Sequence, residues 1–353
     1  MKLKNKVLTE DMEYFNGISY LPWDKLQNAS ILITGATGLI GYNIIHGLLY
    51  ASERRNLNIQ IIALVRHIEE AKKKFADICQ TGARLILIKG DIENLPDIEQ
   101  HIDYIIHGAS PTASSYFIER PVETIITALT GTINILKLAL DKKIQGFVYL
   151  SSMEVYGETK TEEVLSEKDV GYMNPLIVRN SYSESKRMCE TIVASYASEY
   201  DVPAMSIRLA QTFGVGVERN DTRVFAEFAR CAVEGKDIVL LTTGGSKRCY
   251  LYTMDAVSAI VTVMLKGEAG KAYNAGNRNT YCSVKEMAYM VATQLANPPI
   301  EVLFAENSEV SKKFSAPHFY NLNVDELERL GWKANKELLD MYRAMIEVWK
   351  DEG

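Results

Sequence analysis

The sequence predicts an α/β protein in which a doubly wound parallel sheet carries most of the chain and a smaller C-terminal α/β lobe completes it. Three observations support this prediction. Short β-branched runs alternate with helix-like segments, the first run ends in a glycine-rich turn, and no internal repeat or Pro-rich linker interrupts the pattern. Strands that alternate with helices at this spacing are joined by right-handed crossovers, which give a parallel sheet with helices on both faces. The 353 residues, 47% of them hydrophobic, suffice for about two domains.

The predicted elements follow one another along the first 209 residues. Strands are expected at Ser30–Thr34, Ile59–Val65, Arg84–Ile88, Asp103–His107, Gly146–Ser151 and Pro203–Leu209. A helix is expected directly after the first strand, where apolar residues recur from Leu39 to Leu49. Further helices are expected near residues 68–79, 121–141 and 183–199. Because most strands are followed by a helix, the pattern is one of consecutive βα units.

Composition excludes several classes of function. Lys and Arg number 39 against 45 Asp and Glu, a formal net charge of −6, so the chain offers no basic field to nucleic acid or to an anionic membrane. No run approaches the roughly 18 apolar residues of a membrane span. The five cysteines are scattered and include no Cys-x-x-Cys pair, so neither a disulfide framework nor a metal site is expected. A reducing cytoplasm is the expected location.

A glycine-rich turn joins the first strand to the first helix. It reads Gly35-Ala36-Thr37-Gly38-Leu39-Ile40-Gly41, a G-x-x-G-x-x-G pattern. A Cβ in such a turn would block both the tight bend and the close approach of backbone N–H groups to a pyrophosphate, and the helix N-terminus adds partial positive charge. Between a strand and a helix the pattern predicts a Rossmann-type dinucleotide site. The candidate ligands in the turn are Gly35, Thr37, Gly38, Leu39, Ile40 and Gly41.

The ends of the next two strands bear on which dinucleotide binds. A carboxylate at the end of the second strand would accept hydrogen bonds from the ribose of NAD, but the sequence there is Val65-Arg66. Arg66 can pair instead with a ribose 2′-phosphate, which favours NADP; alternatively it only stacks on adenine. After the third strand, Asp91 and Ile92 lie where a side-chain carboxylate can meet the adenine amino group. The predicted cofactor is therefore NAD or NADP.

The chain divides into three parts by pattern. We expect residues 1–28 to form an N-terminal extension, because they are polar and aromatic by turns and precede the first strand. Residues 29–209, with about 250–275, are expected to form the dinucleotide-binding domain. Since no linker separates a second domain, the substrate-binding lobe is expected to be built from residues 210–249 and 276–353.

A second group of polar residues follows the fifth strand. Ser152 stands in Ser151-Ser152-Met153-Glu154-Val155-Tyr156-Gly157, and Tyr182-Ser183-Glu184-Ser185-Lys186 opens a later helix. A spacing of four residues puts Tyr182 and Lys186 on one helix face. A nearby ammonium lowers the pKa of a phenol toward neutrality, so we expect Tyr182 to act as a general base on a hydroxyl while Ser152 holds the same oxygen.

Together these motifs resemble the extended short-chain dehydrogenase/reductases that modify nucleotide sugars, the NAD-dependent epimerase/dehydratase family, from about Ile31 to about Trp332. The resemblance implies a Ser-Tyr-Lys site, a bound nicotinamide cofactor that Lys186 also contacts, and a nucleotide-sugar substrate. It further implies a homodimer packed through the helices near 121–141 and 183–199. His107-Gly108-Ala109-Ser110-Pro111 is similar to a segment of the family's decarboxylases, which adds Ala109 and Ser110 to the cofactor-binding candidates.

Individual residues favour the UDP-glucuronate decarboxylases within this family. Dehydratases place adjacent Asp and Glu after the catalytic Thr; this chain has Met153 in the first position and keeps Glu154. The decarboxylases carry this Glu, and an Arg three residues before the catalytic Tyr, where Arg179 stands here. The segment Gly244–Tyr250 resembles a stretch of the related aminoarabinose-pathway enzyme that contains a functional Arg, here Arg248. A C6 carboxylate favours a guanidinium partner, and Arg223 is a third candidate contact for a phosphate or carboxylate.

Alternatives stay open for two of these arginines. Arg248 contacts the pyrophosphate in one alternative, and Arg179 forms a surface ion pair with Glu184 in the other. The chain also departs from the family pattern. Ala128 replaces a usual Asn, and Gln211, a candidate substrate ligand, replaces an Asn that contacts the substrate phosphate.

The resemblance implies oxidation at C4 and loss of CO2 from the resulting β-keto acid, with Glu154 orienting the ring or assisting decarboxylation. The favoured function is therefore decarboxylation of an NDP-uronic acid such as UDP-glucuronate. The alternatives are a 4-epimerase, dehydratase or ketoreductase acting on a neutral NDP-sugar, and a nucleotide-binding protein without catalysis. The complete set of Ser152, Tyr182 and Lys186 argues against the last.

Overall fold

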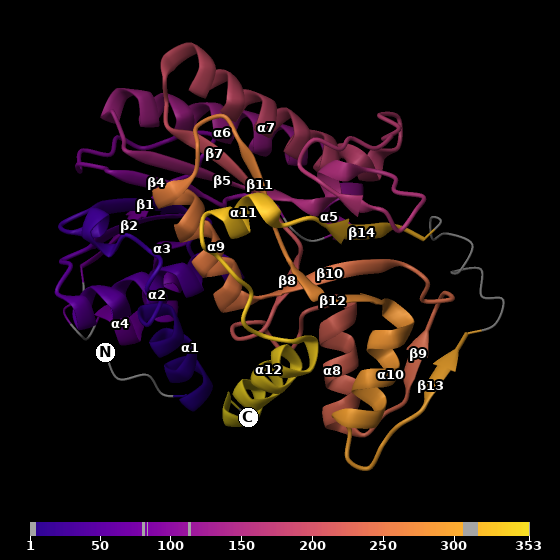
Figure 1. The fold of residues 1–353 in the computed structure, drawn as a ribbon. Helices are drawn as coiled ribbons and strands as arrows, with labels where there is room; N and C mark the ends of the chain where they lie inside the picture. Colours follow the sequence, from indigo (N-terminus) through magenta and orange to yellow (C-terminus); the bar gives the residue numbers. More distant parts are fainter. Residues whose placement is uncertain (1–4, 80–81, 83, 112–113, 306–316, 353) are drawn as a thin grey trace.

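A seven-stranded parallel sheet forms the centre of the computed structural model, which describes residues 5–79, 82, 84–111, 114–305 and 317–352 (Figure 1). The strand order β11-β7-β5-β4-β1-β2-β3 is the doubly wound Rossmann order extended by β11. The predicted fold class is confirmed. All six predicted strands form, each within one residue of its expected bounds. They are β1 (Ser30–Thr34), β2 (Gln60–Val65), β3 (Leu85–Lys89), β4 (Tyr104–His107), β5 (Gly146–Ser152) and β7 (Ala204–Leu209), and β11 (Ala272–Ala275) lies beside β7.

Helices cover both faces of this sheet (Figure 1). The helices α6 (Pro121–Lys142) and α7 (Ser181–Tyr200) pack on one face, and α2 (Leu39–Arg55) and α9 (Thr253–Lys266) pack on the other. Successive strand residues point to opposite faces. In β1, Leu32 therefore joins the core under α6 and α7, whereas Ile31 and Ile33 join the core under α2 and α9. The helix predicted near 68–79 forms as two short helices, α3 (Ile68–Lys74) and α4 (Ala76–Cys79).

A smaller lobe adjoins the carboxyl ends of the sheet strands (Figure 1). Its main sheet has the order β12-β10-β14-β6, with β8 paired to β10, and a second sheet pairs β13 with β9. The strands are β6 (Val164–Leu165), β8 (Gln211–Phe213), β9 (Ile238–Leu240), β10 (Lys247–Tyr252), β12 (Asn277–Ser283), β13 (Val302–Phe304) and β14 (Phe319–Leu322). The helices are α8 (Val224–Glu234), α10 (Val284–Gln294), α11 (Asp325–Arg329) and α12 (Leu338–Glu352). The exact division of the chain between sheet and lobe stays a prediction.

The N-terminal segment packs into the core of the sheet domain. α1 (Lys6–Asn16) lies along α2, and the side chain of Asn5 caps it by accepting hydrogen bonds from the backbone of Val7 and Leu8 at 2.8 and 3.2 Å. Phe15 is fully buried over Gly47 of α2, where an added Cβ would lie 3.1 Å from the Phe15 ring. The 3-10 turn η1 (Trp23–Leu26) then leads into β1.

Asp11 on α1 gives the fold a pH dependence. It is 2% exposed and accepts a hydrogen bond from the Tyr252 hydroxyl at 2.6 Å, and burial raises its pKa to about 7. An unfolded chain loses this proton near pH 4. The folded state therefore binds the extra proton between about pH 4 and 7, so stability falls progressively over this interval and the loss is complete above about pH 7.

We expect Asp11→Asn to raise the free energy of unfolding at pH 8 by up to about 4 kcal/mol and to change it little at pH 3, below the pKa of Asp11 in the unfolded chain. The amide keeps an acceptor for Tyr252 but carries no buried charge at high pH. Thermal unfolding at the two pH values measures the difference, and Asp24→Asn, at an exposed position on η1, is the control. An equal change in melting temperature at both pH values would contradict the assignment.

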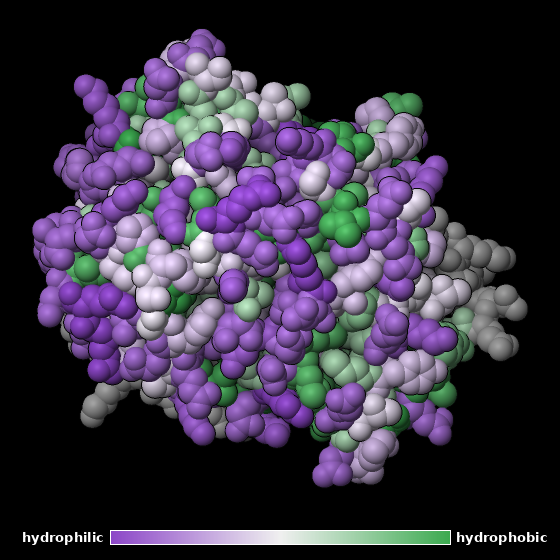
Figure 2. Space-filling model, viewed as in Figure 1, coloured by the Kyte–Doolittle hydropathy of each residue, from purple (hydrophilic) through white to green (hydrophobic). Residues whose placement is uncertain are grey.

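The outer surface of the fold is mainly polar on the face shown in Figure 2, with apolar residues scattered over it. Within the described chain, α6 is the one helix whose length and apolar composition would allow it to cross a membrane. In this fold it packs against α7 and the sheet, and 39% of its most apolar 18-residue stretch is buried. In this structure α6 therefore serves as a helix that covers one face of the sheet.

Candidate functional site

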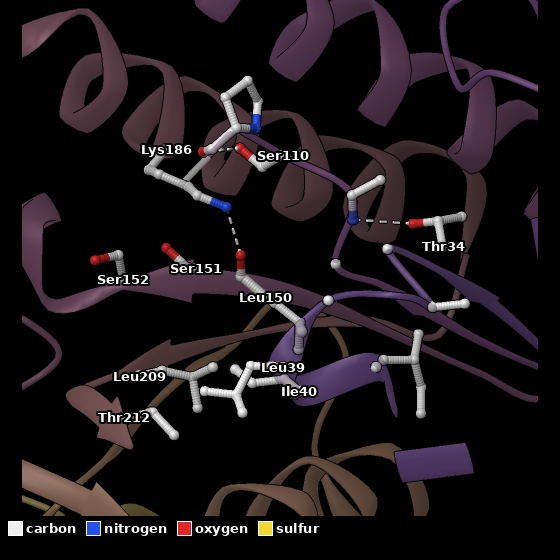
Figure 3. Close-up of a pocket in the computed structure, with 18 of the residues that line it drawn as sticks. Thr34, Leu39, Ile40, Ser110, Leu150, Ser151, Ser152, Lys186, Leu209 and Thr212 are labelled. Atoms are coloured by element: carbon white, nitrogen blue, oxygen red, sulfur yellow. Dashed lines mark hydrogen bonds between the residues drawn. The ribbon is translucent and has the colours of Figure 1, made fainter. Parts of the chain in front are cut away.

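One cavity of about 550 Å³ lies at the carboxyl ends of the sheet strands (Figure 3). Its walls include the residues at or just after the ends of β1, β2, β3, β4, β5 and β7, which is where open α/β sheets bind ligands. Every candidate cofactor, catalytic and substrate residue that the sequence singled out lines this cavity. Their individual roles stay predictions, but the fold brings them together.

The glycine turn has the geometry of a pyrophosphate cradle. Gly35 adopts a φ of +71°, and an added Cβ there would lie 2.7 Å from the backbone of Gly108. A Cβ on Gly41 would lie 2.3 Å from the carbonyl oxygen of Gly35. α2 begins at Leu39 after Gly38, and no side chain in the described chain caps it, so the N–H groups of its first turn face the cavity unblocked. These residues fit a dinucleotide.

The end of the cavity beside β2 and β3, where the sequence predicts the adenosine to bind, carries Arg66 and the loop after β3. Arg66 is exposed at the end of β2, and in the described part of the chain it pairs with no carboxylate. Asp91 accepts a hydrogen bond from the backbone of Glu93 at 2.8 Å. Ile92 packs against Gly131 of α6 so closely that an added Cβ there would lie 2.3 Å from it. Ala109, whose backbone N–H donates to Thr34 at 3.1 Å, and Ser110 continue this wall after β4.

Lys186 lies over the end of β5, as Figure 3 shows. Its amine is buried and donates to the carbonyl oxygen of Leu150 at 2.6 Å. It also lies 4.6 Å from the Tyr149 ring centre and 5.7 Å from that of Tyr182. Burial lowers the pKa of Lys186 to about 8. Ser152 is adjacent at the strand end, where it faces the same cavity.

The expectation that Lys186 lowers the pKa of Tyr182 is wrong for this structure. Burial raises the Tyr182 pKa above its usual range, and the Glu154 carboxylate raises it further. The hydrogen bond with Ser152 and the charge of Arg179 act in the opposite direction but do not outweigh burial. Burial is therefore the main physical reason, and the Lys186 amine, which is directed at Leu150 rather than at the phenol, does not offset it.

Glu154 and Arg179 form an ion pair in the cavity wall. The guanidinium of Arg179 donates to the two Glu154 oxygens at 3.0 and 3.2 Å, and Ser183 donates to one of them at 3.1 Å. The alternative that Arg179 pairs with Glu184 is wrong, because Glu184 lies 3.8 Å from Arg187 instead. Glu154 is positioned by η2 (Met153–Tyr156) and Arg179 by η3 (Val178–Asn180).

The other two arginines differ in their partners. Arg223 is held by Asp221 through two parallel contacts, the shorter of them 2.6 Å. The Nε of Arg248, on β10, is buried without a hydrogen-bond partner among the described residues, and this side chain faces the cavity. Gln211 lies on β8, the strand paired to β10. Arg248 therefore has an unsatisfied donor that could bind a substrate anion. Both alternatives for that anion, the sugar carboxylate and the pyrophosphate, stay predictions.

Sequence reasoning missed two residues at this site. Phe117 on α5 (Ser114–Glu119) stacks on the Tyr182 ring, with ring centres 4.3 Å apart and planes at 12°. Asp221 is the acid that fixes Arg223. Neither lies in a motif, and a single sequence holds no periodicity that marks them. The described residues contain no group of three or more His, Cys, Asp or Glu placed to hold a metal ion.

Comparison with known proteins adds family relationships to this geometry. Residues 31–276 match the model of the NAD dependent epimerase/dehydratase family. UDP-glucuronic acid decarboxylase 3 of Arabidopsis thaliana is 29% identical over 92% of this chain and 90% of that protein. UDP-glucuronic acid decarboxylase 1 of Xenopus tropicalis is 27% identical over 91% of this chain and 72% of that protein. dTDP-glucose 4,6-dehydratase from Bacillus anthracis, solved with NAD, superposes with a TM-score of 0.73 at 21% identity, covering 92% of this chain and 97% of that one.

Proposed function

This chain belongs to the NAD dependent epimerase/dehydratase family, and from that premise we propose that it decarboxylates an NDP-uronic acid such as UDP-glucuronate after oxidation at C4. The family expected from the motifs is confirmed. The observation that carries the proposal is the placement of Glu154 and Arg179 beside Tyr182 in the cavity that also holds the glycine turn. The curated relatives named UDP-glucuronic acid decarboxylase support the same reaction.

Different residues of the cavity would bind the cofactor, accept the proton and bind the substrate. The glycine turn, Asp91, Ala109 and Ser110 would hold a nicotinamide dinucleotide, which when bound supplies the acceptor for the C4 hydride. Tyr182 takes the C4 hydroxyl proton while Ser152 orients that oxygen. The resulting β-keto acid loses CO2 as its C5–C6 bond breaks and the electron pair moves onto the C4 ketone, and the enolate so formed takes a proton at C5 from water or an arginine. Arg248 binds an anionic group of the substrate, since its Nε lacks a partner.

A substrate carboxylate has to compete with Glu154 for Arg179. The guanidinium already uses both of its parallel donors on that carboxylate. When a C6 carboxylate takes this position, Glu154 is displaced toward the sugar ring, where it orients the ring or assists decarboxylation. Arg179 is therefore the residue that couples recognition of an acidic sugar to the placement of Glu154.

We expect Arg179→Met to slow CO2 release from UDP-glucuronate about 10²–10³-fold, because a charge-assisted double contact is lost. Affinity for UDP-glucose, which lacks the carboxylate, should change far less. Release of labelled CO2 and calorimetric binding of the two nucleotides measure these effects. Arg343→Met, at an exposed residue of α12, is the control. Undiminished decarboxylation by the Arg179 variant would remove the main support for an acidic substrate.

The function is tested by incubating the protein with UDP-glucuronate and either NAD or NADP, and by following CO2 and the product mass. A product lighter by one CO2 supports the proposal, and its exact mass separates a released 4-keto sugar from a re-reduced pentose. An unchanged mass with a new chromatographic peak indicates epimerisation. That second candidate, on a neutral NDP-sugar, is favoured by one observation: Glu154 already neutralises Arg179.

We also propose NADP as the preferred dinucleotide, dimerisation through α6 and α7, and a reducing cytoplasm as the location. Arg66 supports the first, because it is exposed beside the adenosine end of the cavity. Dimerisation is supported by four apolar side chains that are exposed on these helices, which are Val122, Ile125 and Ile126 on α6 and Met188 on α7. Comparing KM for the two cofactors and measuring sedimentation equilibrium test these two points. The cysteines whose side chains the structure describes are free, which supports the third.

A further inference from the structure

A nearly buried ion pair lies directly behind the candidate catalytic residues. Arg208 on β7 donates to Glu190 on α7 at 2.7 Å through Nη2 and at 3.0 Å through Nε, in a parallel two-bond arrangement. Their side chains are 12% and 13% exposed. Neither residue lines the cavity, so the proposed reaction leaves this pair without a role.

Glu190 fixes the register of α7 on β5. It follows Lys186 by one helical turn, and it accepts a hydrogen bond from the Ser151 hydroxyl at 2.5 Å. Lys186 in turn lies over Tyr149, two residues before Ser151 on the same face of β5. Two successive turns of α7 are thus held against two residues on one face of β5. A slip of the helix would break both contacts.

Arg208 extends this connection to the turn that carries Glu154. It stands opposite Ser151 in the pairing of β5 with β7. Its Nη1 donates to the Tyr156 hydroxyl at 3.1 Å and to the carbonyl oxygen of Glu167 at 2.9 Å. Tyr156 closes η2 and donates to Asn274 at 2.7 Å. One guanidinium therefore joins the helix of Lys186 to the turn of Glu154.

We propose that the Glu190–Arg208 ion pair is a positioning device for catalysis, which holds Lys186 on α7 and Glu154 on η2 in fixed register with the end of β5. The inference rests on the proposed function, because Lys186 and Glu154 are its candidate catalytic residues. Glu190 and Arg208 touch neither the substrate nor the cofactor. They act through the residues that do.

Because Glu190 is charged, its effect on Lys186 can be measured through the Lys186 pKa. Burial lowers the pKa of Lys186 to about 8, whereas Cys189 and Glu190 act to raise it. The titratable groups that face Lys186 from its own helix are Tyr182, Cys189 and Glu190, and Tyr149 faces it from β5. From β4, His107 is kept neutral by a pKa lowered to about 3. Glu190 is thus a carboxylate whose charge, together with Cys189, favours the protonated form of Lys186 against the effect of burial.

The test measures the titration of Lys186 without any substrate. Lysine labelled with ¹³C at Cε reports each amine by NMR, and Lys186→Met identifies the resonance. In Glu190→Gln we expect the Lys186 midpoint to fall by about half to one pH unit. The alkaline limb of kcat should move by the same amount, with KM for UDP-glucuronate unchanged. Glu199→Gln, at the exposed end of α7, is the matched control and should move neither quantity.

A double variant keeps the test decisive if Glu190→Gln does not fold. Glu190→Gln/Arg208→Met removes both charges and leaves no unpaired buried ion, so it should restore stability while kcat stays reduced, because the contacts to Ser151 and Tyr156 are lost. Full kcat in this folded variant would overturn the inference. A loss of stability and kcat with an unmoved Lys186 titration would overturn the inference and leave the pair a purely structural one. If the wild-type protein releases no CO2 from UDP-glucuronate, the proposed function fails, and the NMR titration still decides the inference.

Discussion

Replacing Tyr182 by Phe is expected to slow oxidation at C4 about 10²–10⁴-fold, because its phenol is the candidate general base for the hydroxyl proton. The ring of Phe would keep the stacking on Phe117 at 4.3 Å, so the fold and the cavity wall should persist. Dinucleotide affinity should also persist, because Tyr182 lies outside the glycine turn. The expected defect is therefore in kcat rather than in binding.

The pH profile makes this prediction sharper. Burial and Glu154 raise the Tyr182 pKa, so only a small fraction of the phenol is ionised at pH 7. The rate of hydride transfer should therefore rise with pH across neutrality in the wild-type protein, and this dependence should disappear in Tyr182→Phe. Nicotinamide absorbance in single-turnover experiments with UDP-glucuronate measures both. Tyr172→Phe, at an exposed residue, is the control. A variant with normal turnover would remove Tyr182 from the mechanism.

The charges of the cavity are already partly balanced before any substrate arrives. Glu154 pairs with Arg179, and Asp221 pairs with Arg223. Arg248 and Arg66 have no such partner in the described chain. A nucleotide sugar brings two negative charges on its pyrophosphate, and a uronic acid brings a third. The distribution thus favours binding in which the substrate takes Arg248 first, with Arg66 left for the dinucleotide, and then displaces Glu154 from Arg179.

The sheet could be predicted from the sequence because its strands are buried on both faces. β1 reads Ser-Ile-Leu-Ile-Thr with every residue buried, and such continuous β-branched and apolar runs mark central parallel strands. The glycine turn was equally clear, since Gly35 and Gly41 stand where a Cβ would meet backbone atoms. The short strands of the lobe were not predicted. β8 and β9 have three residues each, too few to establish a period.

The sequence identified which residues belong to the site more readily than which of them contact one another. Glu154 and Arg179 were both candidates, but their pairing joins residues that are 25 positions apart, through two short 3-10 turns that no pattern marks. The direction of the Tyr182 pKa was predicted wrongly for a related reason. The spacing of Tyr182 and Lys186 gives the helix face but not the direction of the amine, which Leu150 determines.

Gly41→Ala is expected to have the largest effect on cofactor binding. The added Cβ would lie 2.3 Å from the Gly35 carbonyl oxygen and 2.8 Å from the Ala36 Cα, both of them backbone atoms of the turn. Backbone cannot rotate away as a flexible side chain can, so the turn has to move away from α2. Such a shift costs about 1–3 kcal/mol of stability and misaligns the N–H groups that would face a pyrophosphate. We expect dinucleotide affinity to fall at least about 100-fold.

Gly38→Ala is the matched comparison within the same turn. Its added Cβ would lie 3.3 Å from the Gly35 carbonyl oxygen, a contact that a shift of a few tenths of an ångström relieves, and Gly38 has an ordinary φ of −73°. Calorimetric titration with NAD and NADP should therefore rank the proteins as wild type, Gly38→Ala and then Gly41→Ala in decreasing affinity. Far-UV circular dichroism and thermal unfolding separate this loss from global unfolding. Equal affinities for the two variants would mean that the close packing of α2 on the turn does not shape the dinucleotide site.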